Sequence, residues 1–212
     1  MLIKDMSVHL CARSEISEFV EKYHYSKSIN GCISDYCFKL VHDGLIIGAL
    51  FYGKMAMANQ WKRFGDDEKD VIELRRLVCI DNTPKNTESF FIGHTLRWLK
   101  KNTDLKIVVS YADQEYGHAG IVYRASNFNY LGFKKGSKVI VYNGKQYHDK
   151  TIRTYYKGKL KPYAVKIKEA LDNGSAFYKN TAGKHCYTYN LRGLNQYVNQ
   201  PPQNHNENLK HG

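Results

Sequence analysis

The chain lacks the long apolar run that a membrane-spanning helix needs. None of its stretches approaches the roughly 18 consecutive apolar residues that cross a bilayer. Its first ten residues, MLIKDMSVHL, also lack the apolar core of a secretory signal peptide. We therefore expect a protein that neither enters a membrane nor leaves the cytoplasm.

Cysteine is scarce and irregularly spaced, with five residues in a chain of 212. An odd number without a regular spacing argues against a disulfide framework. Cys32 and Cys37 are too far apart for a CxxC pair, and Cys79 lies inside an apolar segment. We expect all five to be reduced thiols.

Several motifs that identify common enzyme classes are absent. The sequence contains no HExxH or paired CxxC metal motif, no Walker loop, no GxSxG and no GxGxxG. Any chemistry must therefore come from less regular groups of residues.

Acidic residues are scarce in one part of a strongly basic chain. The formal net charge is +12, and the segment from Lys134 to Lys168 holds eleven Lys or Arg but one acid, Asp149. Five tyrosines are interleaved with these cations: Tyr142, Tyr147, Tyr155, Tyr156 and Tyr163. Clustered cations attract phosphates, and aromatic rings stack on exposed bases. A solvated surface is the alternative, but the density favours a nucleic-acid interface built on Lys134, Lys135, Lys138, Lys157, Lys159 and Lys161.

The periodicity of apolar residues predicts strands and helices in alternation. A strand over 6–12 precedes a helix that Ser14 caps. Two strands then flank Asp43-Gly44, a dipeptide typical of a tight hairpin turn, and a long polar loop covers 54–70. Further on we expect a strand over 71–81, a helix capped by Thr87, a buried strand over 105–113, a helix over 120–132 and a hairpin around Asn143-Gly144.

This order predicts an α+β fold, a mixed central sheet flanked by helices, with a basic C-terminal extension. We expect residues 1–194 to form a single catalytic domain that includes the basic stretch 134–168. Residues 195–212 are rich in Asn and Gln, contain Pro201-Pro202 and have no periodicity, so we expect a disordered tail.

Three places carry polar groups that could serve a site. The segment DNTPKNTES opens a helix, and this helix start could seat a phosphate between Lys85, Asn86, Thr87 and Ser89, with Arg75 or Arg76 adding charge, or it could be only a well-capped helix. Asp113 follows a buried strand, where ligands collect in α/β sheets, or it makes a turn with Gly117. His24 and Tyr25, in the run YHYSK, form either the rim of an active site or a packed helix end.

The order of elements, with YLGF after the later helix, resembles the GNAT acyltransferase fold. Four segments resemble the Mom family of phage DNA-modification proteins more specifically, over roughly residues 20 to 190. They are YHYSK (23–27), ELRRLVCIDNTPKNTES (73–89), VVSYADQEYGHAGIVYRASNFNYLGF (108–133) and KHCYTY (184–189).

The resemblance implies an enzyme of the host-cell cytoplasm that acts on double-stranded DNA. Its activity would convert adenine N6 to a carbamoylmethyl-type group, which shields phage DNA from host restriction enzymes. The family residues correspond to His24, Tyr25, Arg76, Ser89, Asp113 and Tyr123. We expect catalytic roles for His24, Tyr25, Asp113 and Tyr123, with His24 and Asp113 as proton acceptors.

The cofactor that the fold implies is acetyl-CoA or a related CoA thioester. We expect its phosphates to be held by Arg76, Lys85, Asn86, Thr87 and Ser89, although TPKNTES replaces the Gly-rich loop of ordinary GNAT proteins. Iron is a second candidate cofactor, because joining a carbon fragment to this amine is not simple acyl transfer.

Two other functions are compatible with the sequence. A GNAT acyltransferase that acts on a protein or tRNA amine would share the fold and the donor site. A non-catalytic DNA-binding protein would keep the basic stretch and need no polar pocket.

Overall fold

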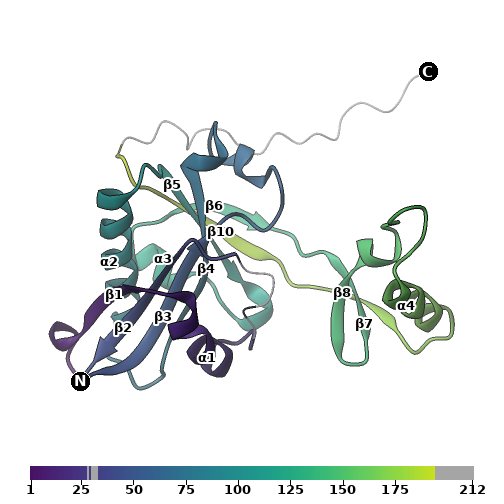
Figure 1. Ribbon diagram of the computed structural model, residues 1–212, viewed down its shortest axis with the longest axis horizontal. Helices are drawn as coiled ribbons and strands as arrows, with labels where there is room; N and C mark the ends of the chain where they lie inside the picture. The colour runs from purple at the N-terminus through teal and green to yellow at the C-terminus, as the bar shows by residue number, and fades with distance from the viewer. Residues whose placement is uncertain (28, 30–32, 194–212) are drawn as a thin grey trace. The chain divides into compact units, whose positions relative to one another are not determined.

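The computed structural model describes residues 1–27, 29 and 33–193 and contains a mixed seven-stranded sheet (Figure 1). The predicted disordered tail, 195–212, lies outside the described residues. Strands β1 to β4 pair antiparallel, and β4 pairs parallel with β5. The strand order is β1 (Ser7–Cys11), β2 (Tyr36–His42), β3 (Leu45–Gly53), β4 (Val71–Cys79), β5 (Ile107–Asp113), β10 (Lys184–Asn190) and β6 (Asn129–Lys134).

Helices cover both faces of the first strands of this sheet. Helix α1 (Arg13–Tyr23) packs Ile16 and Val20 against Phe51 of β3. Helix α2 (Thr87–Asn102) covers the opposite face, where the Thr95 hydroxyl lies 2.7 Å from that of the fully buried Tyr52. Helix α3 (Ile121–Ala125) follows β5 in the chain. Within the described ranges, every helix is too short or too polar to cross a membrane.

The chain divides into two compact units, which we describe separately. The first contains Met1–Tyr111, Gly120–Leu131 and the residues from Cys186 onward, and the second contains Ala112–Ala119 and Gly132–His185. The single catalytic domain expected over 1–194 stays a prediction.

The second unit has a small core of its own. Strands β8 (Lys145–His148), β7 (Lys138–Tyr142) and β9 (Phe177–Asn180) form an antiparallel sheet in that order. Helix α4 (Pro162–Asp172) packs Ile167 and Ala170 against Ile140 of β7, which is fully buried.

The predicted α+β architecture with a mixed central sheet is confirmed, and so are both hairpin turns. Asp43 and Gly44 have φ angles of 50° and 75°, and Asn143 and Gly144 have 49° and 71°. These left-handed values are the ones that a two-residue hairpin requires. Short 3₁₀ helices complete the elements: η1 (Ile3–Asp5), η2 (Gln60–Arg63), η3 (Glu68–Asp70), η4 (Gln114–Tyr116) and η5 (Asp149–Ile152).

The predicted helix boundaries were wrong in three places. Helix α1 starts one residue before Ser14, with Ala12 as its cap, because Glu15 reaches back to the Ala12 N–H at 2.8 Å. Helix α2 is capped by Asn86 in a left-handed conformation, so Thr87 is its first residue. The helix expected over 120–132 ends at Ala125, because Asn127 has a φ of 61° and turns the chain into β6. Helix α4 and strands β9 and β10 were not predicted.

The four described cysteines are free thiols. Cys11 and Cys37 are cross-strand neighbours on β1 and β2. Burial raises the pKa of Cys11 to about 12 and also raises the pKa of Cys37, and burial raises the pKa of Cys79 to about 12. These thiols are therefore poor nucleophiles at neutral pH.

Candidate functional site

Strands β4 and β5 separate halfway along their length. Their ladder joins Val71–Leu74 to Ile107–Ser110, although β4 continues to Cys79. In the part of the chain that the structure describes, β3 and β5 are the only neighbours of β4. The sheet therefore opens into a fork after Leu74. The remaining edge of β4, residues 76–79, has the form of a strand edge to which an extended molecule can add hydrogen bonds.

A β-bulge lies at the same point. Phe51 pairs with Arg76 while Tyr52 pairs with Leu74, so Arg75 is the extra residue in β4. One extra residue reverses the alternation of side chains beyond it. Arg76 therefore shares the face of Phe51, which α1 covers, instead of the face that α2 covers. The bulge decides on which face this guanidinium lies.

Charged side chains of β4 fasten the loop 54–70 beside the fork. The Glu73 carboxylate is 12% exposed and accepts a hydrogen bond from the Ala56 N–H at 3.2 Å. The Arg75 guanidinium lies 3.6 Å from this carboxylate and donates to the Lys54 carbonyl at 2.8 Å. The loop therefore begins at a fixed position.

Arg76 is incompletely satisfied by the protein. Its Nη1 donates to the Arg75 carbonyl at 2.8 Å, but its buried Nε has no hydrogen-bond partner among the described residues. A buried charged donor without a partner is destabilising, so this arrangement is typical of a position that a bound anion completes.

A hydrogen-bonded pair between Gln60 of this loop and Tyr111 of β5 was not predicted from the sequence. Gln60 donates through Nε2 to the Tyr111 hydroxyl at 2.7 Å, whereas its buried Oε1 has no partner within the described residues. Burial, with Cys186 and Glu73 nearby, raises the pKa of Tyr111. The two residues are 51 positions apart, so no local signal in the sequence could have indicated this pair.

His24 ends α1 and is nearly buried, with 4% of its surface exposed. The backbone N–H of Ser26 donates to its Nδ1 at 3.1 Å, and the Ser26 hydroxyl lies 2.8 Å from the same atom. Because Nδ1 accepts from a backbone N–H, the proton of the neutral ring sits on Nε2. Ser26 is half-buried, so its hydroxyl connects the basic nitrogen to the surroundings.

Tyr25 lies directly on His24. The two rings are 4.0 Å apart at an angle of 35°, and Tyr25 is 41% exposed. The run YHYSK thus combines a buried imidazole with an exposed phenol and a bridging hydroxyl. It is both a packed helix end and a source of polar groups.

Tyr123 of α3 lies on the α2 side of the sheet. Its side chain is buried, and its ring packs 5.4 Å from that of Tyr187. Burial raises the pKa of Tyr123, an effect that the nearby hydroxyl of Ser110 partly offsets. The Ser110 hydroxyl is itself buried without a well-formed hydrogen bond among the described residues. The Tyr123 phenol therefore stays protonated at neutral pH.

The residues predicted to hold phosphates surround the start of α2. Lys85 and Asn86 are exposed, whereas Thr87 is fully buried and its hydroxyl donates to the Pro84 carbonyl at 2.7 Å. The Ser89 hydroxyl donates to the Asn86 carbonyl at 3.0 Å. Both hydroxyls therefore shape the helix start, and Lys85 supplies its charge.

Asp113 belongs to the second unit, in which it makes a turn. Its carboxylate accepts from the Glu115 N–H at 3.1 Å and lies 2.8 Å from Nζ of Lys184. Gly117 closes the turn with a φ of 74°. These contacts correspond to the turn alternative, and a catalytic role for Asp113 stays a prediction.

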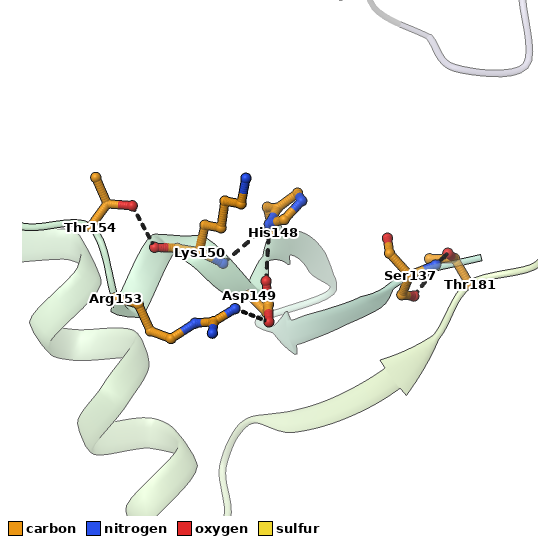
Figure 2. Close-up of polar contacts among 7 residues, drawn as sticks. All are labelled: Ser137, His148, Asp149, Lys150, Arg153, Thr154 and Thr181. Carbon is orange, nitrogen blue, oxygen red and sulfur yellow. Dashed lines mark hydrogen bonds and ion pairs between the residues drawn. The ribbon is translucent and has the colours of Figure 1, made fainter. Parts of the chain in front are cut away.

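The predicted DNA-binding lysines all lie exposed in the second unit. In the described structure, none of them pairs with a carboxylate. Figure 2 shows why Asp149, the one acid of the stretch, leaves this charge intact. Its carboxylate lies 2.5 Å from Arg153 and 3.2 Å from His148, so both of its oxygens are engaged locally. The lysines in question are Lys134, Lys135, Lys138, Lys157, Lys159 and Lys161.

The five interleaved tyrosines fall into two groups. Tyr142 and Tyr147 are partly buried against the core of the second unit. Tyr155, Tyr156 and Tyr163 are more than half exposed, at 62%, 64% and 51%. Only the second group could stack on a base.

The described part of the chain contains no group of three or more His, Cys, Asp or Glu side chains that could hold a metal ion. The Nδ1 lone pair of His24 is also engaged by Ser26. Iron as a cofactor stays a prediction.

The architecture defines a class of protein: the fold is that of GNAT acetyltransferases. An acetyltransferase from Bacillus subtilis in complex with CoA superimposes with a TM-score of 0.51 at 9% identity, over 87% of this chain and 98% of that one. Arabidopsis thaliana NAA60 in complex with acetyl-CoA gives a TM-score of 0.54 at 8% identity, over 89% and 99%.

Within this class, the chain belongs to the Mom protein family, whose model matches residues 5–205. It is 31% identical over 116 residues to the methylcarbamoylase Mom of Escherichia phage Mu. That alignment covers 53% of this chain and 48% of the relative, so the chain spans about half the length of the curated relative that it matches. The resemblance seen in the sequence is confirmed.

Gly120 is the position on which the placement of Tyr123 depends. It precedes α3 with a φ of 71°, and a Cβ there would lie 2.3 Å from the buried ring of Tyr187. We expect Gly120→Ala to reduce the free energy of unfolding by about 2–5 kcal/mol, since overpacking adds to backbone strain. Gly117→Ala is the matched control, because Gly117 has a φ of 74° but open space around it. It should cost about 1–2 kcal/mol. Equal losses in denaturant titrations of the two variants would contradict the close approach of Tyr187.

Proposed function

We propose that the chain is a DNA-modification enzyme that converts adenine N6 in double-stranded DNA to a carbamoylmethyl-type group. Such a modification would protect phage DNA from host restriction. The observation that carries the proposal is membership of the Mom family on a fold with an open strand edge and an incompletely satisfied arginine. The name of the phage Mu relative, a methylcarbamoylase, supports the type of group transferred.

The donor site that we propose is the fork between β4 and β5. The bulge places Arg76 at the opening of this fork. The backbone of residues 76–79 can form hydrogen bonds with the extended arm of a donor molecule, and Lys85 adds positive charge at the start of α2. These features fit a CoA thioester, and the titles of both acetyltransferase structures name CoA or acetyl-CoA as their ligand. When bound, such a thioester would supply the two-carbon fragment of the group. Acyl transfer alone, with the CoA thiol leaving, would give an N6-acyl adenine, so the carbamoylmethyl-type group requires in addition an oxidant for the methyl carbon and an amine donor for the amide nitrogen.

His24 and Ser26 would move the proton that the amine loses. Adenine N6 is a poor nucleophile because its lone pair is delocalised into the ring. As N6 bonds to carbon it must release a proton, and the nearest base would be Nδ1 of His24. Because His24 is nearly buried, the transfer would pass through the Ser26 hydroxyl, 2.8 Å from Nδ1. Tyr123, whose raised pKa keeps it protonated, would act as a hydrogen-bond or proton donor.

The exposed lysines of the second unit would hold the phosphate backbone. Because these lysines are positively charged, the partner that they attract is an anion. Asp149 does not neutralise them, since it already forms an ion pair with Arg153. An enzyme that modifies a base in a duplex must grip the backbone while the base leaves the stack. The basic stretch is what favours DNA over a protein amine as the substrate.

Nucleoside mass spectrometry of cells that express the chain separates the alternatives. Our proposal predicts a modified adenosine in DNA that is absent from vector controls. A new mass in protein or tRNA would favour the acyltransferase alternative, and no new mass with intact DNA binding would favour the non-catalytic one.

Arg76→Ala tests the donor site. We expect it to weaken the binding of acetyl-CoA about 10- to 150-fold, the worth of a charge-assisted hydrogen bond, in calorimetric titrations. DNA affinity should be unchanged. Arg97→Ala is the control, because Arg97 lies exposed on α2. Failure of the unmodified chain to bind any CoA thioester would remove this cofactor from the proposal.

His24→Ala tests the proton path. We expect the modified adenosine per folded molecule to fall about 10²- to 10⁴-fold, the usual contribution of an acid–base group. Some stability should be lost as well, about 1–3 kcal/mol, because the imidazole is buried and bonded. His9→Ala is the matched control, since His9 also bonds a serine two residues away, at 2.7 Å, but lies exposed on β1. Full activity per folded His24→Ala molecule, with melting and nucleosides measured on one preparation, would leave His24 with a packing role only.

A further inference from the structure

A tight turn in the second unit presents two tyrosines and three lysines to solvent. We call residues 155–161 the aromatic turn. Tyr156 and Lys159 exchange both backbone hydrogen bonds, with N–O distances of 2.8 and 3.1 Å. Lys157 and Gly158 between them have φ angles of 49° and 76°. Two left-handed residues closed by reciprocal bonds form a defined turn, so its side chains project from a fixed backbone.

The residue at the tip is not the one that the turn geometry prefers. The described residues include two other turns of this kind, and their first positions are Asp43 and Asn143, residues that tolerate a left-handed φ. The aromatic turn has Lys157 at the corresponding position. A lysine there is strained relative to Asn or Asp, so the turn itself does not explain it. A functional need for a positive charge at the tip of the turn would explain why a lysine occupies this position.

Tyr155 and Tyr156 are the most exposed tyrosines in the described part of the chain, at 62% and 64%. Adjacent large rings left in water are unusual on a protein surface and mark sites of interaction. Lys157, Lys159 and Lys161 surround them, and in the described structure none of these lysines pairs with a carboxylate. Asp149 is held by Arg153 and His148 (Figure 2). The partner that fits this surface is therefore a negatively charged molecule with planar groups on which the tyrosine rings can stack.

We propose that the aromatic turn is a wedge that enters the DNA duplex beside the target adenine. A ring of Tyr155 or Tyr156 would stack on the base pair that is uncovered when the adenine leaves the helix, and the lysines would contact the flanking phosphates. This inference rests on the proposed function, because only a base-modifying enzyme needs to fill such a gap. The aromatic turn would then help to open the duplex, in addition to attracting it by charge.

Fluorescence anisotropy with the full chain tests the wedge. The probes are a labelled duplex of mixed sequence and a second duplex in which one adenine faces an abasic site, so that this adenine leaves the stack easily. The intact chain should bind the second duplex more tightly. Tyr155→Ala/Tyr156→Ala should lower that affinity about 5- to 150-fold, the worth of a base–aromatic stack, without changing the salt dependence.

Two further variants separate the roles of rings and charges. Tyr155→Phe/Tyr156→Phe should retain the affinity, because the ring and not the hydroxyl stacks. Lys157→Ala/Lys159→Ala should reduce the log–log salt slope by about 1.8 on both duplexes, about 0.9 for each lost phosphate contact. Phe177→Ala is the matched control, because Phe177 is an aromatic residue, 60% exposed on β9, that lies outside the turn and the basic stretch, and it should bind like the intact chain.

Three results would overturn the wedge: unchanged affinity of the alanine pair, an equal loss in the phenylalanine pair, or tighter binding of the intact chain to an RNA hairpin than to either duplex. Its failure is distinguishable from failure of the proposed function. If cells that express the chain contain modified adenosine but Tyr155→Ala/Tyr156→Ala binds DNA like the intact chain, only the wedge is rejected. If the variants lose affinity as expected but no modified adenosine is found in the cells, only the proposed chemistry is rejected.

Discussion

The bulge at Arg75 is the feature on which the proposed donor site depends. Without the extra residue, Arg76 would follow the alternation of β4 onto the α2 face, among Tyr52 and Leu74. With it, the guanidinium lies on the α1 face at the point where the β4–β5 ladder ends. One inserted residue therefore places a cation beside the open strand edge, and the local pairing of Glu73 with Arg75 anchors the adjoining loop.

Unpaired polar atoms in the first unit gather near this fork. Arg76 Nε, Gln60 Oε1 and Ser110 Oγ are the buried side-chain atoms that lack hydrogen-bond partners among the described residues. Each belongs to β4, β5 or the loop between β3 and β4. Leaving such atoms unsatisfied is destabilising, which favours a bound molecule that completes Arg76 on the α1 face, whereas Ser110 lies on the α2 side near Tyr123. The second unit differs in carrying unpaired positive charge, since the six lysines predicted to bind DNA have no carboxylate partners within the described residues.

Much of the fold followed from local signals in the sequence. The two Gly-containing turns, the apolar run of β5 and the periodicity of α1 each reflect short-range preferences, and they predicted the correct elements. The N-caps failed because Ser14 and Thr87 look like caps, whereas Glu15 and a left-handed Asn86 determine the helix starts. Strand β10 was missed because KHCYTY becomes a strand only through pairing with distant segments.

The site was less predictable, for the same reason. The sequence indicated Arg76 and His24 as candidates, but not that a bulge would place Arg76 on the face of α1. Gln60 and Tyr111 are 51 positions apart, and nothing in the local pattern joins them. The distinction between partly buried Tyr142 and exposed Tyr156 also depends on tertiary structure, because Tyr142 of β7 packs against the core of the second unit whereas Tyr156 lies in a turn outside the sheet.

The central claim is that the open edge of β4 binds the donor. Hydrogen–deuterium exchange of the full chain, with and without acetyl-CoA, measures this edge directly, because a bound extended arm would protect its backbone amides. The account predicts slower exchange in residues 76–79 when the thioester is present. Unchanged exchange there, with protection appearing elsewhere in the chain, would contradict it.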